Sequence, residues 1–268
     1  MKTDAMTFLR LPIRWWLALA ILLAGLGLCV PLYAGYLGAL HPVFDTIAHF
    51  RIHLAAVVAG VAVVLLCLKG WRAAAAGLIA LAVLPVVATL GLPTLPQGAQ
   101  ADGRDPPQPR YRLLHLNLRF DNPTPDAVLS MIGREKPDVI TLAEVSAMWK
   151  PRLEVLRASY PYWVSCNQST RNGGVAVLSR RPFAEGGRQE CHDRGSLAIG
   201  TFDFGGGPVE VAALHLGWPW PFGQDWQVRN LAPVLRSLSE TAVLAGDFNA
   251  TPWSVMAGRV AQAGGLEF

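Results

Sequence analysis

The first third of the chain is dominated by three long apolar runs. The first, from Trp15 to Leu40, is nearly uncharged and long enough to span a lipid bilayer. The second covers about Ile52 to Leu68, and the third runs from Ala73 to Leu92. The second run is short, and the flanking Arg51 and His53 would have to reach the membrane interface. The pattern predicts a membrane anchor of about three transmembrane α-helices.

Basic residues around these runs indicate how they cross the membrane. Arg10 and Arg14 before the first run are also typical of a cleaved signal peptide, but the two apolar runs close behind favour an anchor that stays in the chain. Lys2 adds positive charge before the first run, and Lys69 and Arg72 lie between the second and third. Because cytoplasmic loops carry an excess of Lys and Arg, the N-terminus is predicted to be cytoplasmic. The protein is then a multi-pass protein of the inner or plasma membrane, and the residues after the third run lie outside the cytoplasm.

A polar, proline-rich stretch separates the anchor from the rest of the chain. Residues 93–110 include the run Pro-Gln-Gly-Ala-Gln-Ala-Asp-Gly-Arg-Asp-Pro-Pro-Gln-Pro and show no hydrophobic periodicity, which predicts a semi-extended linker. The chain therefore divides into an anchor at 1–92, a linker at 93–110 and a folded domain at 111–268.

Strand-like and helix-like patterns alternate along this domain. Thr124 followed by Pro125 is a typical helix start, and Asp225 is expected to cap a later helix. Apolar runs predict strands that include residues 197–204 and 209–216. Strands interleaved with helices indicate an α/β layered fold.

Three of the apolar runs deliver a polar residue at or near their end. These residues are Asn117, Glu144 and His215. Polar groups brought in by separate strand ends are typical of a site rather than of a solvated surface. His115 shares a strand face with Asn117, so it is expected either beside that site or in the core.

A fourth apolar run leads into Gly246-Asp247-Phe248-Asn249. Taken alone, this tetrapeptide is typical of an Asx-rich turn. Gly246 is expected to let the backbone turn, and the spacing of two would place Asp247 and Asn249 on one face of an extended segment. Together with the three other strand ends, this carboxylate and carboxamide predict a shared site.

These motifs resemble the endonuclease/exonuclease/phosphatase superfamily of metal-dependent phosphodiesterases, which is DNase I-like. The resemblance covers about Arg112 to the C-terminus and implies an α/β four-layer sandwich, with two packed sheets flanked by helices, behind the transmembrane anchor. It rests on the strand with Asn117, the run Pro-Asp-Val-Ile-Thr-Leu-Ala-Glu ending at Glu144, Gly-Gly-Val-Ala-Val-Leu-Ser from Gly173 to Ser179, Leu-His-Leu around His215, and Gly-Asp-Phe-Asn-Ala-Thr-Pro from Gly246.

The resemblance implies a role for each of these residues. Glu144 is expected to be the main ligand of Mg²⁺ or Mn²⁺, with Asn117 as its neighbour, because a hard cation neutralises a phosphate oxygen. A strand-end surface carboxylate is the alternative for Glu144. Asp247 and Asn249 would position the attacking water and the phosphate, and His215 would protonate or hydrogen-bond the phosphate or the leaving group.

The sequence departs from the family after Asn249. Members of the family close the domain with a further strand and an Asp-His pair that activates the water, and no such pair follows Asn249 here. The chain is therefore expected to be a fragment, incomplete at its C-terminus and inactive as it stands. Two functions remain open: a membrane-tethered phosphoesterase working outside the cytoplasm, or a non-catalytic membrane module that binds a phosphorylated ligand or partner.

Charge limits the choice of substrate. Residues 1–110 hold 8 of the 23 Lys and Arg and 4 of the 19 Asp and Glu, so residues 111–268 hold 15 of each class. No strong basic surface for long duplex DNA is expected in a domain with balanced charge. Nucleic acid and a phospholipid headgroup both remain candidate phosphoester substrates, and the lipid bilayer is the predicted partner of the anchor.

An aromatic segment, Trp218-Pro219-Trp220-Pro221-Phe222, follows His215. Its prolines hold it out of regular structure, so Trp218 and Trp220 are predicted to bind substrate, or to rest at the lipid interface, from a loop at the mouth of the site. Burial of these rings in the core is the alternative.

Two cysteines lie in the domain that is predicted to face an oxidising compartment. Cys166 and Cys191 can form a disulfide there, although spacing alone leaves this open.

Overall fold

The computed structural model describes residues 12–91, 110–168 and 170–267. These residues belong to two compact units, one comprising Met1–Gln100 with Trp253–Val255 and the other Ala101–Pro252 with Met256–Phe268. The predicted linker lies outside the described residues, apart from Arg110. So do Lys2 and Arg10, on which part of the predicted orientation depends.

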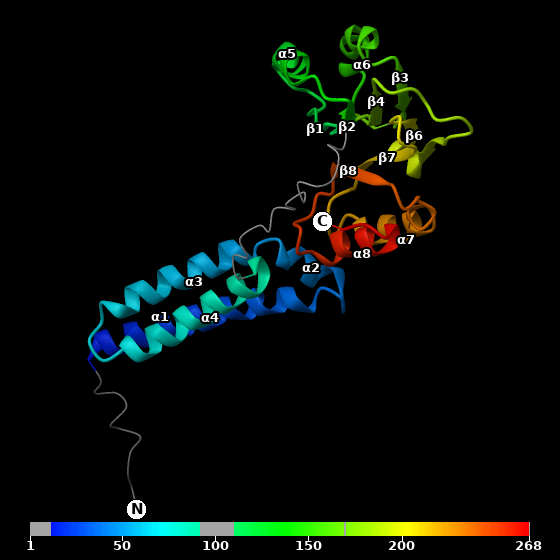
Figure 1. Ribbon diagram of the computed structural model, residues 1–268. Coiled ribbons are helices and arrows are strands. Elements are labelled where there is room, and N and C mark those ends of the chain that lie inside the picture. Colours follow the sequence, from blue (N-terminus) through cyan, green and yellow to red (C-terminus); the bar gives the residue numbers. More distant parts are fainter. Residues whose placement is uncertain (1–11, 92–109, 169, 268) are drawn as a thin grey trace, which may run out of the picture. The chain divides into compact units, whose positions relative to one another are not determined.

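The first unit is a bundle of apolar helices (Figure 1). Its main helices lie side by side and bury a core of mostly small and aliphatic residues, among them Ala55, Val58 and Leu78. Apolar side chains also cover the outside of the bundle, which is typical of helices surrounded by lipid rather than water. The helices are α1 (Ile13–Ala34), followed by a 3-10 turn (Gly35–Leu37), α2 (Pro42–Ala48), α3 (Arg51–Leu66) and α4 (Arg72–Leu90).

Two of these helices are long and apolar enough to cross a membrane by themselves. They are Ile13–Leu37, which includes the 3-10 turn, and Arg72–Leu90. The predicted second span is different: α3 has 16 residues and passes the same test only together with α2, from which it is bent by 61°. The break lies just before Arg51, a residue that the sequence placed at the edge of this run.

The second unit contains two four-stranded mixed sheets (Figure 1). In the first, the strands run in the order β1-β2-β4-β3, and only the β1–β2 pair is parallel. In the second the order is β5-β6-β7-β8, and only the β7–β8 pair is parallel. The strands are β1 (Leu113–Asn117), β2 (Val139–Val145), β3 (Tyr162–Ser165), β4 (Gly174–Ser179), β5 (Gln189–His192), β6 (Leu197–Asp203), β7 (Pro208–His215) and β8 (Val243–Asp247).

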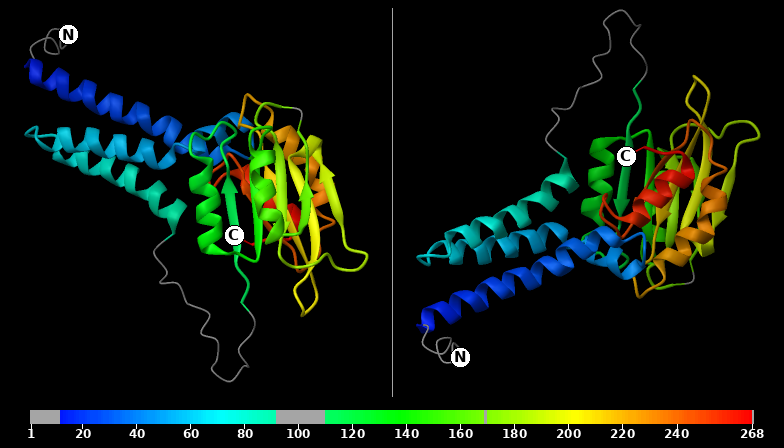
Figure 2. Two further views of the ribbon diagram at one scale, coloured as in Figure 1. Left: turned by 90° about the horizontal axis from the view of Figure 1, so that it is seen from above. Right: turned by 90° about the horizontal axis from the view of Figure 1, so that it is seen from below.

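Helices flank the pair of sheets, as Figure 2 shows. The sheets pack face to face through buried residues such as Val177, Phe202 and Ala213. On the outer face of the first sheet, Ile140 and Leu178 pack against residues of α5 and α6. The fold is therefore the predicted four-layer α/β sandwich of two sheets flanked by helices. The helices of this unit are α5 (Pro125–Glu135), α6 (Trp149–Leu153), α7 (Gln224–Leu235) and α8 (Val255–Gly264).

One predicted helix start is wrong by two residues. Asp225 was expected to cap the helix, but α7 begins at Gln224, and Gly223 occupies the N-cap position with φ of 86°. A glycine reaches this left-handed conformation at no steric cost, so the turn before α7 fixes where the helix begins. Asp225 lies in the first turn instead and pairs with Arg229 at 2.7 Å.

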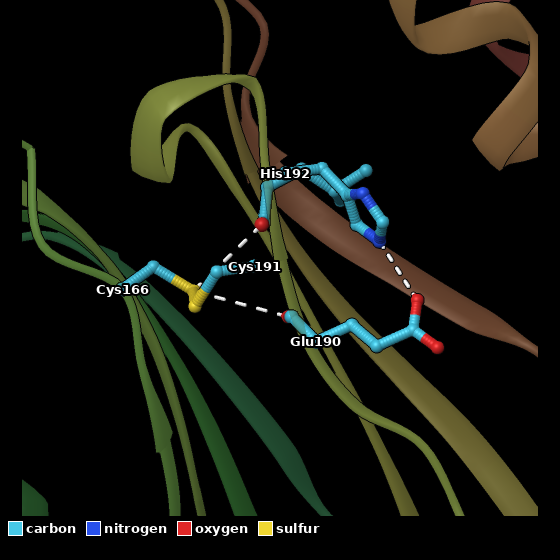
Figure 3. The surroundings of a disulfide bond; sticks show 5 residues. Cys166, Glu190, Cys191 and His192 are labelled. Carbon is cyan, nitrogen blue, oxygen red and sulfur yellow. Dashed lines mark hydrogen bonds and ion pairs between the residues drawn. A yellow bond between two sulfur atoms is a disulfide. The ribbon is translucent and has the colours of Figure 1, made fainter.

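A disulfide joins the two sheets at their edges. Cys166, directly after β3, is bonded to Cys191 in β5, with the Cα atoms 5.5 Å apart (Figure 3). The spacing in the sequence alone did not decide whether this bond forms. It closes a separation of 25 residues, for which chain entropy predicts about 3–4 kcal/mol of stabilisation. Beside it, the carboxylate of Glu190 contacts His192 Nε2 at 2.8 Å.

Candidate active site

The predicted polar residues meet where the parallel strand pairs end. Asn117 is the last residue of β1, and Glu144 is the penultimate residue of β2. His215 and Asp247 end β7 and β8 and are register partners. Parallel neighbours bring their carboxyl ends to the same edge of a sheet, which is where open α/β sheets bind ligands. Four strand ends from two sheets thus supply one cluster.

Glu144 is aimed into this cluster by an irregularity in β2. The pairing of β2 with β4 shifts register between Leu142 and Val145, and Glu144 has a φ of 60°. A left-handed glutamate costs on the order of 1–3 kcal/mol, so the surrounding contacts must hold it there. One of these contacts is the backbone N–H of Phe120, which donates to Glu144 Oε2 at 2.7 Å.

Asn117 connects the carboxylates of the two sheets. Its Nδ2 donates to Glu144 Oε1 at 3.1 Å and to Asp247 Oδ2 at 2.7 Å. Its Oδ1 accepts a bond from the backbone N–H of Arg119 at 2.9 Å. These three bonds fix which way the amide faces, because the reverse orientation would place oxygen against two carboxylates.

Asp247 is held from several sides. Its Oδ2 lies 4.0 Å from His215 Nε2, and its Oδ1 accepts from the backbone N–H of Asn249 at 2.9 Å. Gly246, just before it, was expected to let the backbone turn, but the structure gives another reason for glycine at this position. It does not turn the chain; it lies inside β8, where an added Cβ would sit 2.0 Å from the carbonyl oxygen of Leu214. The parallel pair therefore requires glycine at this position because of a close backbone approach.

The predicted shared face of Asp247 and Asn249 is wrong. β8 ends at Asp247, and Asn249 adopts a φ of 45°, so the two residues do not alternate along one strand. The backbone bond to Asp247 Oδ1 is instead an Asx turn, the alternative considered for this tetrapeptide. The side chain of Asn249 still reaches the cluster: its Nδ2 donates to the carbonyl of Leu216 at 2.7 Å, which leaves one amide hydrogen and Oδ1 for a ligand.

Part of the cluster lines a cleft of about 520 Å³. Glu144, His215, Asn249 and Trp218 contribute to its wall, whereas Asn117, Asp247 and Trp220 do not. The remaining lining residues, which the sequence analysis missed, are Phe120, Gln168, Thr170, Asn172, Leu216, Gly217 and Gln227. A second cavity of about 410 Å³ is lined by residues that include Tyr111, Leu113, Val209 and Val243, with Arg112 as its one charged lining residue. The polar cleft, not this apolar cavity, has the groups that chemistry requires.

Two glutamines of α7 hold the loop beside the cleft. Gln224 Nε2 donates to the carbonyls of Gly217 at 2.7 Å and Phe248 at 2.9 Å, and Gln227 Oε1 accepts from the N–H of Gly217 at 2.7 Å. Gln224 is 1% exposed. It therefore links the turn after His215 to the turn after Asp247. No motif in the sequence marks this residue, because its role depends on two loops that meet only in the fold.

His115 lies on the neighbouring part of β1, with its Nδ1 3.0 Å from Thr141 Oγ1. Burial lowers the pKa of this imidazole, and the negative charge of Asp247 partly opposes that effect. Of the two positions expected for His115, the contact with a neutral hydroxyl and the effect of Asp247 describe a half-buried residue next to the cluster.

The donors suit a hard cation. Two carboxylates and an amide converge, and oxygen ligands of this kind, one or two carboxylates with water completing the shell, are what Mg²⁺ takes. Asn117 faces Glu144 with its nitrogen, so ligation through its oxygen requires the amide to rotate and release Arg119. Among the residues that the structure describes, no group of three or more His, Cys, Asp or Glu could hold a metal ion.

Several solved structures are similar to this chain at low identity. A D. rerio TDP2 humanized by 14 mutations is 20% identical over 59% of this chain and 67% of its own, with a TM-score of 0.45. Beta toxin from Staphylococcus aureus, in a mutant with bound magnesium ions, is 14% identical over 60% and 72%, with a TM-score of 0.44. Sphingomyelinase C from Streptomyces griseocarneus is 18% identical over 59% and 70%, with a TM-score of 0.41. Similarities at this level carry no argument about substrate.

Sequence comparison gives the family directly. No curated protein matches the chain. The sequence model of the Endonuclease/Exonuclease/phosphatase family matches residues 114–267, which is more than half of the chain and includes every member of the cluster. The chain belongs to the endonuclease/exonuclease/phosphatase family.

Proposed function

We propose that the chain is a membrane-tethered phosphoesterase that hydrolyses a phosphodiester bond with the help of a divalent cation. The observation that supports this most strongly is the convergence of Glu144 and Asp247, delivered by different sheets, on the single amide of Asn117. Two carboxylates so close repel one another unless a positive group lies between them. A fold that maintains this arrangement, with Glu144 in the wall of a polar cleft, is suited to a cation and an anionic substrate.

Each side chain of the cluster has its own role in the proposed reaction. Glu144, with Asn117 beside it, would hold Mg²⁺ or Mn²⁺, which when bound neutralises charge on a phosphate oxygen and polarises the phosphorus. Asp247 accepts a hydrogen bond from the attacking water and orients it. Asn249 donates its remaining amide hydrogen to a phosphate oxygen, and His215 donates to the phosphate or to the oxygen of the leaving group.

The tether and the compartment are part of the proposal. Two helices long and apolar enough to cross a membrane precede the catalytic unit in the chain. The disulfide between Cys166 and Cys191 supports a location outside the cytoplasm, because such bonds persist in oxidising compartments.

The test combines metal binding and turnover by the full-length protein in lipid nanodiscs. Glu144→Gln keeps the shape of the side chain but removes its charge, so we expect Mn²⁺ affinity, measured by titration calorimetry, to fall at least about tenfold. Turnover of a chromogenic phosphodiester with Mg²⁺ should fall about 100-fold or more. Glu185→Gln makes the same chemical change at an exposed position outside the cleft lining and should alter neither quantity.

Each other outcome has a clear meaning. Unchanged metal affinity in Glu144→Gln would remove Glu144 from the metal site. A native protein that binds Mn²⁺ and inorganic phosphate but turns over no phosphodiester would favour the alternative, a non-catalytic membrane module that binds a phosphorylated ligand.

A further inference from the structure

Four large aromatic side chains stand in solvent next to the cleft. Trp218, Trp220, Phe222 and Trp226, here called the aromatic rim, are 66%, 46%, 74% and 54% exposed. They lie within nine residues, between the end of β7 and the first turn of α7. So many large exposed aromatic side chains within one short segment are unusual for a monomeric soluble domain and indicate a contact surface.

The loop is built to keep these rings outside the core. Its base at Gly217 is held by Gln224 and Gln227 of α7, and the N–H of Phe222 donates to the carbonyl of Pro219 at 2.9 Å. Prolines at 219 and 221 further restrict the backbone. The alternative in which these aromatics are buried in the core is therefore wrong.

The rim continues into the cleft. Trp218 belongs to both, since it lines the cleft together with Glu144 and His215 and is two-thirds exposed. A surface that seats the rim therefore presents its own polar groups directly to the site.

Charge and composition favour a lipid surface over a nucleic acid. From residue 216 to residue 228 the one charged residue is Asp225, which is paired with Arg229. A polyphosphate backbone needs Lys and Arg beside the stacking rings, and none lies in this segment. Indole rings, by contrast, prefer the boundary between lipid headgroups and acyl chains, where the ring is buried and its N–H stays hydrated.

The bilayer that holds the apolar helices of the chain is also available to the rim. The same chain contains the apolar helices Ile13–Leu37 and Arg72–Leu90. Covalent attachment to a membrane-crossing segment makes rim binding an intramolecular event, so even a weak interfacial preference populates the docked state.

We propose that the aromatic rim docks into the lipid–water interface of the bilayer that holds the helices, so that the cleft acts on the headgroup phosphodiester of a membrane lipid. This deepens the proposed function and rests on it for the choice of substrate. Water oxygen bonds to phosphorus, the phosphorus–oxygen bond to the leaving alcohol breaks, and the alkoxide takes up the proton that the water loses. The products are a phosphomonoester and an alcohol.

The docking is tested by quenching of tryptophan fluorescence, which does not depend on activity. The full-length protein is placed in vesicles of phosphatidylcholine, either plain or brominated in the acyl chains. The variant Phe222→Ser/Trp226→Ser removes two rim side chains that do not line the cleft. We expect it to lose at least about half of the bromine-quenchable emission that the rim contributes, whereas Trp163→Phe, which removes an indole of β3, should leave that emission unchanged.

The substrate arm compares turnover of vesicle phosphatidylcholine with that of a soluble chromogenic phosphodiester. We expect the double variant to lose about tenfold or more on the lipid and less than twofold on the soluble compound. Equal losses on both would mean that the rim supports packing, and unchanged quenching would mean that it does not enter the bilayer; either result overturns the proposal. A single-stranded oligonucleotide is assayed in parallel. If its turnover is the only activity that the double variant loses, the rim stacks on bases, and the proposal is also overturned.

Failure of the proposed function gives a different pattern. Native protein that turns over neither diester with Mg²⁺, while its bromine-quenchable emission still falls in the double variant, would remove the phosphoesterase and leave the docked surface. If the double variant does not fold, as judged by circular dichroism, Phe222→Ser alone serves, because 74% of this residue is already exposed.

Discussion

Single residues at this site are constrained by backbone geometry as much as by chemistry. Glu144 and Asn249 both adopt positive φ, which few non-glycine residues do, and both lie in the cluster. Such conformations persist where neighbouring contacts over-determine them, and they gather at functional sites. Gly246 is the complementary case, because the close approach of the Leu214 carbonyl leaves no room for any side chain.

Replacement of Gly246 by alanine should separate β7 from β8. The added Cβ would lie 2.0 Å from the backbone oxygen of Leu214, and no side-chain rotation can relieve this clash because the backbone fixes the position of Cβ. We expect Gly246→Ala to lower the free energy of unfolding by about 3 kcal/mol or more, measured by urea denaturation in detergent micelles. Gly206→Ala is the matched control, because its Cβ meets nothing within 4 Å and should change the value by less than about 0.5 kcal/mol. Equal stability of both variants would contradict the close approach.

Glu190 should make the domain sensitive to acid. Hydrogen bonds from Arg188, at 3.0 and 2.8 Å, and one from His192 lower the pKa of this carboxyl from 4.5 to about 2, although burial opposes them. A depressed pKa in the folded state contributes stability that is complete above about pH 4.5 and is lost as the pH falls towards 2. The side chain is 40% exposed, so solvent screening limits the contribution to about 1 kcal/mol or less.

Glu190→Gln should therefore flatten the decline in stability between pH 4.5 and 2 without changing its value at the low-pH end. Acid unfolding followed by near-ultraviolet circular dichroism measures this. Glu154→Gln, which breaks an ion pair whose partners are 50% and 58% exposed, should leave the decline as steep as before. Parallel declines in the native protein and in Glu190→Gln would show that Glu190 makes no such contribution.

At the scale of elements, the strands could be predicted and their irregularities could not. Runs of apolar residues that end at Asn117, Glu144, His215 and Asp247 are local patterns, and each does end a strand or lie one residue from its end. The local pattern of apolar residues indicates which positions are buried and how long a strand is. The position of the site at the strand ends followed from these patterns.

The register break at Glu144 depends on a different strand. It occurs where Val145 pairs with Gly174, and an added Cβ at Gly173 would lie 2.2 Å from the carbonyl oxygen of Val145. Such pairing is set by contacts between segments nearly thirty residues apart, so no pattern within β2 could indicate it. The same reason explains why the sequence did not identify Gln224, whose two partner loops are distant in the chain.

Gln224 provides a test of the link between α7 and the site. Gln224→Glu keeps the size of the side chain but replaces the donor with a carboxylate oxygen, which repels the carbonyls of Gly217 and Phe248. We expect kcat on a soluble phosphodiester to fall about 10- to 100-fold with a smaller change in KM, because the Asp247–Asn249 turn moves relative to the substrate. Gln262→Glu on α8, outside the cleft lining, should leave kcat unchanged. A loss of stability with unaltered kcat would give Gln224 a structural role alone.

On the scale of the whole molecule, the bundle itself bears on topology. Trp15, in the first turn of α1, packs edge-to-face against Trp71, just before α4. Their ring centroids are 5.1 Å apart. At the other end, Arg51 donates to the carbonyl of Gly35 at 3.0 Å and to Thr89 Oγ1 at 2.8 Å. The starts of α1 and α4 therefore lie together, and so do their ends.

Two helices that run in the same direction cannot cross a membrane in succession unless the chain returns between them. Only α2 and α3 are available for that return. α3 alone is about 24 Å long at 1.5 Å per residue, short of a hydrocarbon core of about 30 Å, and the bend of 61° leaves α2 to complete the distance. The parallel arrangement of α1 and α4 is thus the one that the predicted three crossings would require, in spite of the short second span.

With three crossings, the N-terminus and the unit that holds the cleft would lie on opposite sides of the membrane. With Lys69 and Arg72 in the loop between α3 and α4, the positive-inside rule assigns that loop to the cytoplasm. A reporter enzyme that is active only outside the cytoplasm should therefore be active when fused after Arg110 and inactive when fused after Gly70. A reporter that fluoresces only in the cytoplasm serves as the control and should give the inverse pattern at the same two positions. The reverse pattern, with the fusion after Gly70 active and the fusion after Arg110 inactive, would mean that α2 and α3 do not cross the membrane and that the unit after α4 is cytoplasmic.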